Sequence, residues 1–336
     1  MIRFATIGTN FVTGWFLEAA AKCKELQYTG VYSRREERAR EFAAEHGALA
    51  IHTDLTKLAE DPDIDAVYIA SPTAFHFEQT ARMLSRGKHV LCEKPLASNW
   101  NEAQRLFEIA AGHGVVLLEA MRSVYDPGFK TIEANLSRLG KIRRATFQYC
   151  QYSSRYDKFK AGIIENAFNP ALSNGALMDI GVYCVHPLVR LFGMPDRVLA
   201  DAVKLENGLD GAGTILAGYD SGMQAELLYS KISDSKVPCQ IQGEAGSMTI
   251  GEITNPRQVT LYSRKGEPEP LLAETPGGNN MVHEVREWVR LIQEGGKKEN
   301  PHMRFSLMEL KIMDEARRQT GIRFPADKAE NWKNFR

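Results

Sequence analysis

A lysine that could meet a bound ligand stands in the tripeptide Glu93-Lys94-Pro95. The tripeptide directly follows residues 89–92, an apolar stretch typical of a short buried strand. Ligands of open α/β sheets bind at the carboxyl ends of strands, so a lysine at this position can meet a bound ligand. We therefore expect a reactive site at this strand end, with Glu93 beside it in a role that the sequence does not define.

Strands and helices alternate over the first 120 residues and must position this lysine. Periodicity predicts strands at 2–7, 27–32, 66–70, 89–92 and 115–118, and helices at 12–23, 35–46, 56–60, 75–86 and 101–112. Such alternation requires a parallel sheet that helices cover on both faces. The expected fold class is therefore α/β, with an N-terminal Rossmann domain over residues 1–122.

The first strand runs into Gly8-Thr9-Asn10-Phe11, where a dinucleotide fold places its phosphate-binding turn. Only the first of the usual three glycines is present. Asn10 stands where the backbone must approach a pyrophosphate, and asparagine tolerates left-handed geometry, so the turn remains feasible. Strand before and helix after favour a dinucleotide site, and the alternative is an ordinary βα turn.

The end of the second strand indicates which dinucleotide is bound. An NAD site usually has Asp or Glu there, whereas this chain has Ser33 and Arg34, with Arg38 one turn further on. A guanidinium can pair with a 2′-phosphate through two hydrogen bonds, and the serine hydroxyl can add a third. We therefore expect NADP, with NAD as the alternative cofactor; the other interpretation of these residues is a solvated, charged helix start.

The pattern changes after residue 122 to longer strand candidates. These are residues 144–152, 197–205, 213–219, 223–230, 238–243, 247–250 and 258–263. With helices at 173–192, 281–294 and 305–318, they predict a C-terminal α+β domain over 123–336 with an open, mostly antiparallel sheet. The helix at 305–318 could pack back on the first domain. Apolar residues on the outer sheet face, such as Leu228, predict a homodimer or higher homo-oligomer.

Composition narrows the class of partner. The 42 Lys and Arg residues balance 42 Asp and Glu residues, which gives no electrostatic reason to expect nucleic acid or an anionic membrane. The chain starts with an apolar strand rather than a signal peptide, and its five cysteines include no CxxC pair. We expect a cytoplasmic protein with reduced thiols, no metal and a small-molecule partner.

Four motifs together resemble one family. They are Gly8-Thr9-Asn10, Ser71-Pro72-Thr73 with His76, Glu93-Lys94-Pro95, and Gly175-Ala176-Leu177-Met178-Asp179-Ile180-Gly181-Val182-Tyr183. In this order they are similar to the glucose-fructose oxidoreductase, inositol dehydrogenase and rhizopine-catabolism (Gfo/Idh/MocA) family, and the resemblance covers nearly the whole chain. The fold that it implies, a Rossmann domain followed by an open sheet, agrees with the fold predicted from the pattern of strands and helices.

The resemblance implies three catalytic residues. Lys94 would lie beside the nicotinamide ribose and stabilise the substrate oxygen, and Tyr183 would take the acid/base place that is a histidine in many members. A phenol has an ordinary pKa near ~10, and a neighbouring ammonium lowers it. Asp179 would orient substrate or lysine, and it shares a helix face with Tyr183 at i and i+4. The alternative for Tyr183 is a core aromatic.

Further residues are candidates for contacts with the cofactor or the substrate. Gly8, Thr9, Asn10, Phe11, Ser71, Pro72, His76 and Glu93 would contact the cofactor, on their places at strand ends. Arg122 and His186 are candidate substrate contacts; an interdomain salt bridge and a structural histidine are the respective alternatives.

These inferences converge on an NADP-dependent oxidoreductase. It would transfer a hydride between nicotinamide and a hydroxyl or carbonyl of a sugar, polyol or cyclic diol held between the two domains. The alternative is a ligand-sensing, NADP-binding regulator without turnover, because a family fold alone does not prove catalysis.

Overall fold

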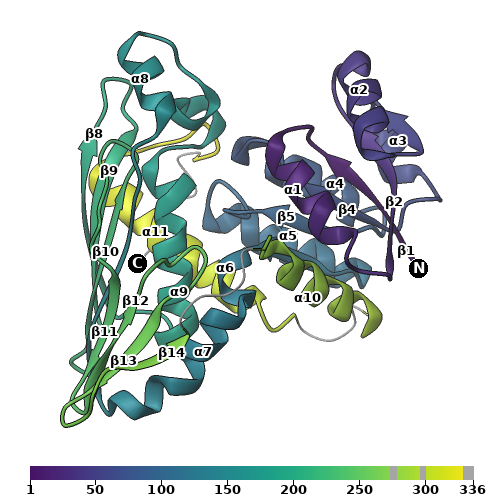
Figure 1. Cartoon of the computed structure of the whole chain (residues 1–336). Helices are drawn as coiled ribbons and strands as arrows, with labels where there is room; N and C mark the ends of the chain where they lie inside the picture. The colour runs from purple at the N-terminus through teal and green to yellow at the C-terminus, as the bar shows by residue number, and fades with distance from the viewer. Residues whose placement is uncertain (273–277, 296–299, 328–336) are drawn as a thin grey trace. The chain divides into compact units, whose positions relative to one another are not determined.

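The computed structural model describes residues 1–272, 278–295 and 300–327 (Figure 1). The chain forms two compact units. The first comprises Met1–Ala120 with Asn279–Ser306, and the second comprises Met121–Gly278 with Leu307–Arg336. Residues 279–306, expected in the second domain, therefore belong to the first unit.

The first unit is built on a parallel sheet of six strands in the order β3-β2-β1-β4-β5-β6. The strands are β1 (Ile2–Ile7), β2 (Leu26–Tyr32), β3 (Ala50–His52), β4 (Ala66–Ile69), β5 (His89–Glu93) and β6 (Leu117–Ala120). The sequence missed only β3, whose three half-buried residues are too few to show a period. The strand order changes direction at β1, so the carboxyl ends of β1 and β4 frame the position where such sheets bind ligands.

Helices connect these strands. They are α1 (Phe11–Ala20), α2 (Glu36–His46), α3 (Leu55–Glu60), the 3-10 turn η1 (Thr73–Phe75), α4 (His76–Leu84), α5 (Trp100–His113) and α10 (Met281–Gln293). Asn99 caps α5 by accepting a hydrogen bond from Glu102 N, and Gly114 ends it in the left-handed conformation. The late helix α10 packs on α1 (Figure 1), with Trp288 fully buried in its inner stripe.

The second unit contains a mixed sheet of eight strands in the order β14-β13-β12-β11-β7-β10-β9-β8. They are β7 (Ile142–Cys150), β8 (Arg197–Lys204), β9 (Asp210–Gly218), β10 (Gln224–Ser230), β11 (Cys239–Gly243), β12 (Gly246–Ile250), β13 (Val259–Ser263) and β14 (Glu269–Leu272). The sheet is mostly antiparallel, as expected, but β7 and β10 pair in parallel at its centre. The edge strand β14 was not expected.

The second unit also contains helices. They are α6 (Arg122–Tyr125), α7 (Pro127–Asn135), η2 (Leu136–Leu139), α8 (Ser154–Lys160), η3 (Asn166–Phe168), η4 (Pro170–Leu172), the π-helix η5 (Leu177–Gly181), α9 (Val182–Phe192) and α11 (Met303–Thr320), of which residues from Leu307 belong to this unit. Both η5 and α9 lie against β7 and β10. Ala225, Leu227 and Tyr229 of β10 are buried in this core, and they alternate along the strand with Leu228, which was expected on the outer face.

The stretch Pro170–Phe192 is long and apolar enough to cross a membrane, with a mean hydropathy of 1.3. However, 78% of its most apolar window is buried inside the structure, as in the core helix of a globular domain. Length and composition here are therefore weak evidence for a membrane span.

Candidate active site

The turn after β1 depends on a glycine. Gly8 has φ +113°, and a Cβ at this position would lie 2.8 Å from the carbonyl oxygen of Ala70 at the end of β4. Only glycine adopts this conformation readily and permits this close approach. The turn therefore leaves backbone, rather than a side chain, at the place where a Rossmann fold receives a pyrophosphate.

Asn10 replaces the second glycine of the usual motif in an unforeseen way. Its φ is −99°, so the turn does not use the left-handed geometry that asparagine tolerates. Its Oδ1 accepts hydrogen bonds from Val12 N (2.9 Å) and Thr13 N (3.1 Å), and its Nδ2 donates to Ala70 O (2.8 Å). Asn10 thus caps α1 and ties the ends of β1 and β4 together, because its amide carries both an acceptor and donors.

A groove of about 410 Å³ opens along the carboxyl ends of β1, β2 and β4. Seven of the predicted cofactor residues line it: Gly8, Thr9, Asn10, Ser33, Arg34, Ser71 and Pro72. The groove is also lined by residues that were not predicted, among them Tyr32, Leu55, Phe75, Glu78 and Gln79. The glycine turn, a helix amino terminus and a basic rim fit the phosphates and ribose of a dinucleotide.

The basic rim has defined geometry. The guanidinium of Arg34 lies over the ring of Phe75, 5.8 Å from its centroid. Ser33 Oγ accepts from Arg35 N at 3.3 Å. Arg38 donates to Thr9 O at 2.8 Å and pairs with Glu41, so it holds the phosphate turn, and its direct contact with a cofactor stays a prediction.

His76 is buried behind the groove rather than in its lining. Its Nε2 lies 2.8 Å from Ser71 O, and its Nδ1 lies 3.0 Å from Pro95 O. Burial lowers the pKa of His76, which favours the neutral ring. This geometry favours a positioning role in which His76 ties the end of β4 to the Lys94-Pro95 turn.

Glu93 and Glu119 shape that turn from two sides. Tyr68 donates a 2.6 Å hydrogen bond to Glu93 Oε1, and Lys94 N donates to Glu93 Oε2 at 3.3 Å. The buried carboxylate of Glu119 accepts from Leu96 N at 2.9 Å. The Lys94–Pro95 bond is cis, and the Lys94 side chain is half-buried. Strand ends thus hold this lysine on a well-anchored backbone.

In the second unit, the helix that carries the other candidates starts later than expected. Ser173, the expected start, is left-handed with φ 54°, and the helical stretch opens with η5 at Leu177. The buried carboxylate of Asp210 accepts from Leu177 N at 2.6 Å. A Cβ on Gly175 would lie 2.2 Å from Asp210 Oδ1, so the glycine of the motif makes room for this cap.

Asp179 and Tyr183 follow this cap in different kinds of helix. Asp179 lies in the π-helical turn and forms a 2.7 Å ion pair with Lys231, whereas Tyr183 lies in the first turn of α9. The π turn replaces the regular spacing assumed for an i, i+4 face. Tyr183 is 7% exposed. Its ring stands edge-on to that of Tyr149, with 5.8 Å between the centroids, and the Arg122 guanidinium lies over it at 5.9 Å.

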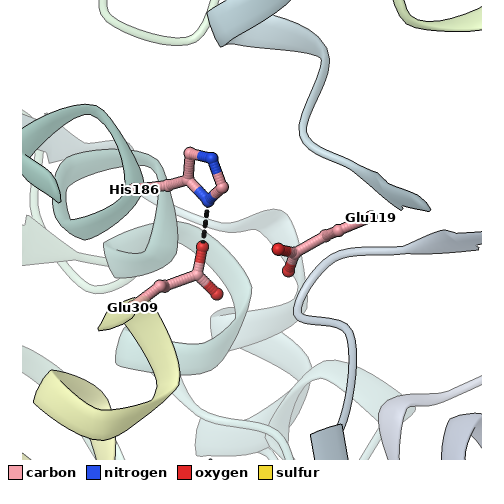
Figure 2. A group of neighbouring side chains, drawn as sticks. All are labelled: Glu119, His186 and Glu309. Carbon is pink, nitrogen blue, oxygen red and sulfur yellow. Dashed lines mark hydrogen bonds and ion pairs between the residues drawn. The ribbon is translucent and has the colours of Figure 1, made fainter. Parts of the chain in front are cut away.

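His186 is buried one turn further along α9. Figure 2 shows its Nδ1 directed at Glu309 of α11, at a distance of 2.6 Å. The two side chains are 3% and 0% exposed. A buried pair of this kind favours the structural alternative for His186 over a substrate contact.

Comparison with known proteins agrees with this geometry. Residues 2–121 match the model described as oxidoreductase family, NAD-binding Rossmann fold, and residues 135–249 match the GFO/IDH/MocA C-terminal domain. The chain belongs to the Gfo/Idh/MocA family of oxidoreductases. The resemblance noted in the sequence is therefore confirmed. As a member of this family, the protein is an enzyme of the oxidoreductase class.

Two relatives in this family align along their full length. The chain is 50% identical over 331 residues to scyllo-inositol 2-dehydrogenase (NADP(+)) IolU of Bacillus subtilis, covering 98% of this chain and 100% of that protein. It is 29% identical to mouse trans-1,2-dihydrobenzene-1,2-diol dehydrogenase, covering 97% and 99%. Among solved structures, KijD10, a 3-ketoreductase from Actinomadura kijaniata, has a TM-score of 0.84 at 23% identity, covering 95% and 98%, and shows the shared fold.

Several important residues of this family member were not predicted. Tyr68, Asp210 and Lys231 each act on a motif residue from a distant strand or strand end. None stands in a local motif, so only pairing across the sheets reveals them. The sequence does carry one signal for Lys231. Buried and more exposed residues alternate along β10, and a charged lysine directly follows this half-buried strand.

Proposed function

We propose that this protein is an NADP-dependent dehydrogenase that oxidises one hydroxyl of a cyclic polyol to a ketone, and catalyses the reverse reduction. The observation that supports this most is the 50% identity, over the full length of both chains, to an NADP(+)-dependent scyllo-inositol 2-dehydrogenase. The diol dehydrogenase relative also has a secondary alcohol on a ring as its named substrate. A ring carrying neighbouring hydroxyls is thus the substrate class.

The groove of the first unit would hold the cofactor. Gly8 and Asn10 would receive the pyrophosphate at the start of α1, and Ser33 with Arg34 would bind the 2′-phosphate. A Cβ on Gly8 would lie 2.8 Å from Ala70 O, so glycine is what keeps this turn against the end of β4, where the groove is lined by backbone. NADP, when bound, supplies the hydride acceptor or donor, and the protein supplies orientation and charge.

Three side chains would act on the substrate. Lys94 would stabilise the negative charge that develops on the reacting oxygen, and Tyr183 would remove the hydroxyl proton in oxidation or return it in reduction. Asp179 would accept a hydrogen bond from a hydroxyl of the ring and fix its orientation. The acid/base role of Tyr183 accounts for a polar aromatic at 7% exposure beside the Arg122 guanidinium.

The test is turnover of scyllo-inositol, myo-inositol and trans-diols, followed by absorbance of the reduced cofactor with NADP+ and with NAD+. We expect NADP+-dependent oxidation of at least one cyclic polyol. Lys94→Ala and Tyr183→Phe should each lower kcat by at least about 100-fold. A group that stabilises a developing oxyanion contributes about 10²–10³-fold, and a general acid–base group contributes about 10²–10⁴-fold. Tyr262→Phe, at a 39% exposed tyrosine of β13, is the matched control.

Two results would contradict parts of the proposal. Near-native turnover in either active-site variant would exclude the assigned role of that residue. Tight NADPH binding without turnover of any polyol or diol in the panel, and without turnover of sugars and aldehydes added to it, would instead favour the NADP-binding regulator.

Self-association through the second sheet belongs to the same proposal. The outer face exposes Leu199 (63%), Val203 (57%) and Leu216 (37%) on neighbouring strands β8 and β9. Apolar side chains on an open sheet face are usually covered, and a second copy of the chain is the simplest cover. Light scattering at micromolar concentration should give a homodimer or larger assembly; a monomer would contradict this.

A cytoplasmic location is also part of the proposal. All five cysteines are free thiols, in keeping with a reducing, cytoplasmic location.

A further inference from the structure

Lys231, which directly follows β10, is a deeply buried lysine in contact with Asp179 of the family motif. Its side chain is only 3% exposed. Its Nζ donates to Asp179 Oδ2 at 2.7 Å and to the carbonyl oxygen of Ala167 at 2.9 Å. A buried ammonium is costly unless it is paired and hydrogen-bonded, so these two acceptors are what stabilise its position.

The first acceptor connects Lys231 to the active-site motif. Asp179 retains a side-chain exposure of 32% although Lys231 is almost completely covered. The carboxylate is therefore held from the buried side and accessible from the other. An anchored carboxylate presents its oxygens in one orientation, whereas an exposed one would rotate among several rotamers.

The second acceptor connects Lys231 to a separate segment. Ala167 lies in η3, and the ammonium also lies 4.6 Å from the ring centroid of the next residue, Phe168. Phe168 is fully buried and packs on Phe159 (5.5 Å) and Tyr156 (5.9 Å) of α8. One ammonium thus holds both the motif aspartate and the residues that anchor the α8 segment, Ser154–Phe168.

We propose that Lys231 is a positioning residue that orients Asp179 for the substrate and couples it to the α8 segment. This inference rests on the proposed function, in which Asp179 contacts a ring hydroxyl. Removal of the ammonium leaves the Asp179 carboxylate without this buried partner and frees the Ala167 carbonyl. The motif aspartate and the α8 segment are then no longer held by the same ammonium.

The test compares Lys231→Met, which keeps the length but removes the charge, with Lys231→Arg, which keeps the charge. Lys231→Met should lower kcat for the cyclic polyol by about 10- to 100-fold, since misplacement of a catalytic group by about 1 Å can cost about 10²-fold. NADPH affinity should not change, because the proposed cofactor groove is built from the first unit alone. Lys130→Met, at an exposed lysine of α7, is the control for loss of a lysine in the same unit.

Two measurements separate positioning from general destabilisation. Asp179→Asn combined with Lys231→Met should cost little more than either single change, because both act through one contact. Hydrogen exchange should become faster at the amides of Phe168 and Asp179, which bond to Glu165 O and Gly175 O in their turns. Lys231→Arg should recover part of kcat.

Wild-type kcat and KM in Lys231→Met would overturn the inference and leave the proposed function intact. Additive losses in the double variant would also overturn it. If the wild-type protein turns over no polyol, the proposed function fails, and unchanged exchange in Lys231→Met would then reject the coupling independently.

Discussion

The hydroxyl of Tyr68 donates a 2.6 Å hydrogen bond to Glu93 Oε1, directly before Lys94. Tyr68 is completely buried in β4, and its neighbour strand β5 ends in Glu93. Burial, reinforced by the negative charge of Glu93, raises the pKa of Tyr68 well above its ordinary value, so the phenol remains a donor. This pair defines a role for the glutamate of the Glu93-Lys94-Pro95 motif: it fixes the backbone that presents the lysine.

Tyr68→Phe removes this donor without removing the ring. We expect kcat/KM to fall about tenfold and the free energy of unfolding to fall by about 1–3 kcal/mol, as for a buried hydrogen bond to a charged group. Tyr28→Phe removes a comparable phenol that bonds Thr6 at 3.1 Å, and it should lower stability with little change in turnover. Equal kinetic effects of the two variants would refute a specific role for the Tyr68–Glu93 pair.

Gly8→Ala tests the phosphate turn. The added Cβ would meet Ala70 O at 2.8 Å at a φ of +113°, so the turn must shift away from the end of β4. NADPH affinity, measured by fluorescence titration, should fall at least about tenfold, a change of about 1.4 kcal/mol. Gly47→Ala is the control, because φ there is +79° but nothing lies within 4 Å of the new Cβ. It should lower stability slightly and leave NADPH binding unchanged; matching losses would contradict the role of Gly8.

Arg34→Ala tests the preference for NADP. Loss of a guanidinium that pairs with the 2′-phosphate should raise the KM for NADP+ by about 10- to 100-fold and leave the KM for NAD+ nearly unchanged. Arg105→Ala provides the comparison, since Arg105 lies over Phe77 at 5.4 Å in a similar contact but does not line the groove. A parallel rise for both cofactors in Arg34→Ala would show that Arg34 does not read the phosphate.

We expect Glu287 of α10 to make a pH-dependent contribution to the free energy of unfolding. Hydrogen bonds from Arg290, supplemented by His302, lower its pKa to about 2 against the opposing effect of burial. Because the folded pKa lies below the ordinary value of 4.5, the contribution is fully present above about pH 4.5 and is lost as the pH falls towards 2.

Glu287→Gln should therefore lower the free energy of unfolding at pH 7 by about 1–3 kcal/mol. Its difference from wild type, measured by urea unfolding, should shrink steadily below pH 4.5. Glu294→Gln breaks the more exposed pair of the same Arg290 and should cost less than about 1 kcal/mol. A constant Glu287→Gln difference from pH 7 to pH 3 would contradict this assignment.

The proposed site could be predicted where local sequence carries the chemistry. Gly8, Ser33, Arg34 and Ser71 stand at strand ends, and parallel strands bring their carboxyl ends to one edge, so their joint lining of the groove follows from the alternating pattern. Asn10 was predicted to take part, but its capping geometry depends on the position of Ala70. His76 follows a strand end, as a cofactor contact would. Its ring nitrogens instead lie within hydrogen-bond distance of two backbone carbonyls behind the groove.

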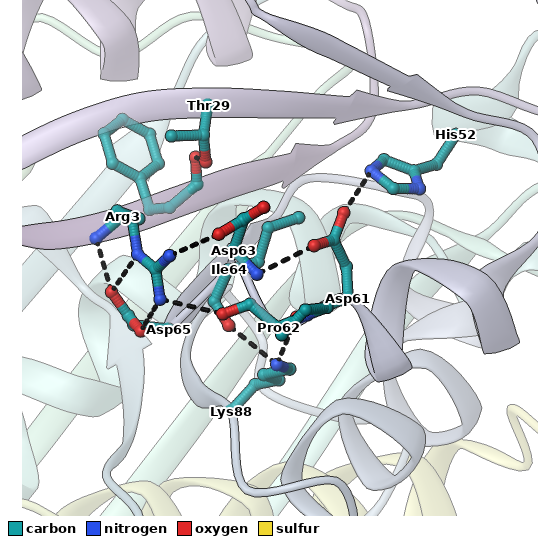
Figure 3. A network of polar contacts seen from close by, with 10 residues as sticks. Arg3, Thr29, His52, Asp61, Pro62, Asp63, Ile64, Asp65 and Lys88 are labelled. Carbon is teal, nitrogen blue, oxygen red and sulfur yellow. Dashed lines mark hydrogen bonds and ion pairs between the residues drawn. The ribbon is translucent and has the colours of Figure 1, made fainter.

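The succession of strands and helices, the Rossmann unit, the mostly antiparallel second sheet and the family could all be predicted from the residues, because periodicity and short motifs are local properties. Which distant groups come into contact depends on how the strands pair and the helices pack. The return of 279–306 to the first unit, the link from Lys231 to Asp179, and the network in which Arg3 pairs with Asp63 and Asp65 beside buried Lys88 (Figure 3) are of this kind. These contacts join residues tens to hundreds of positions apart. Burial decides their strength, and burial exists only after the sheets have formed.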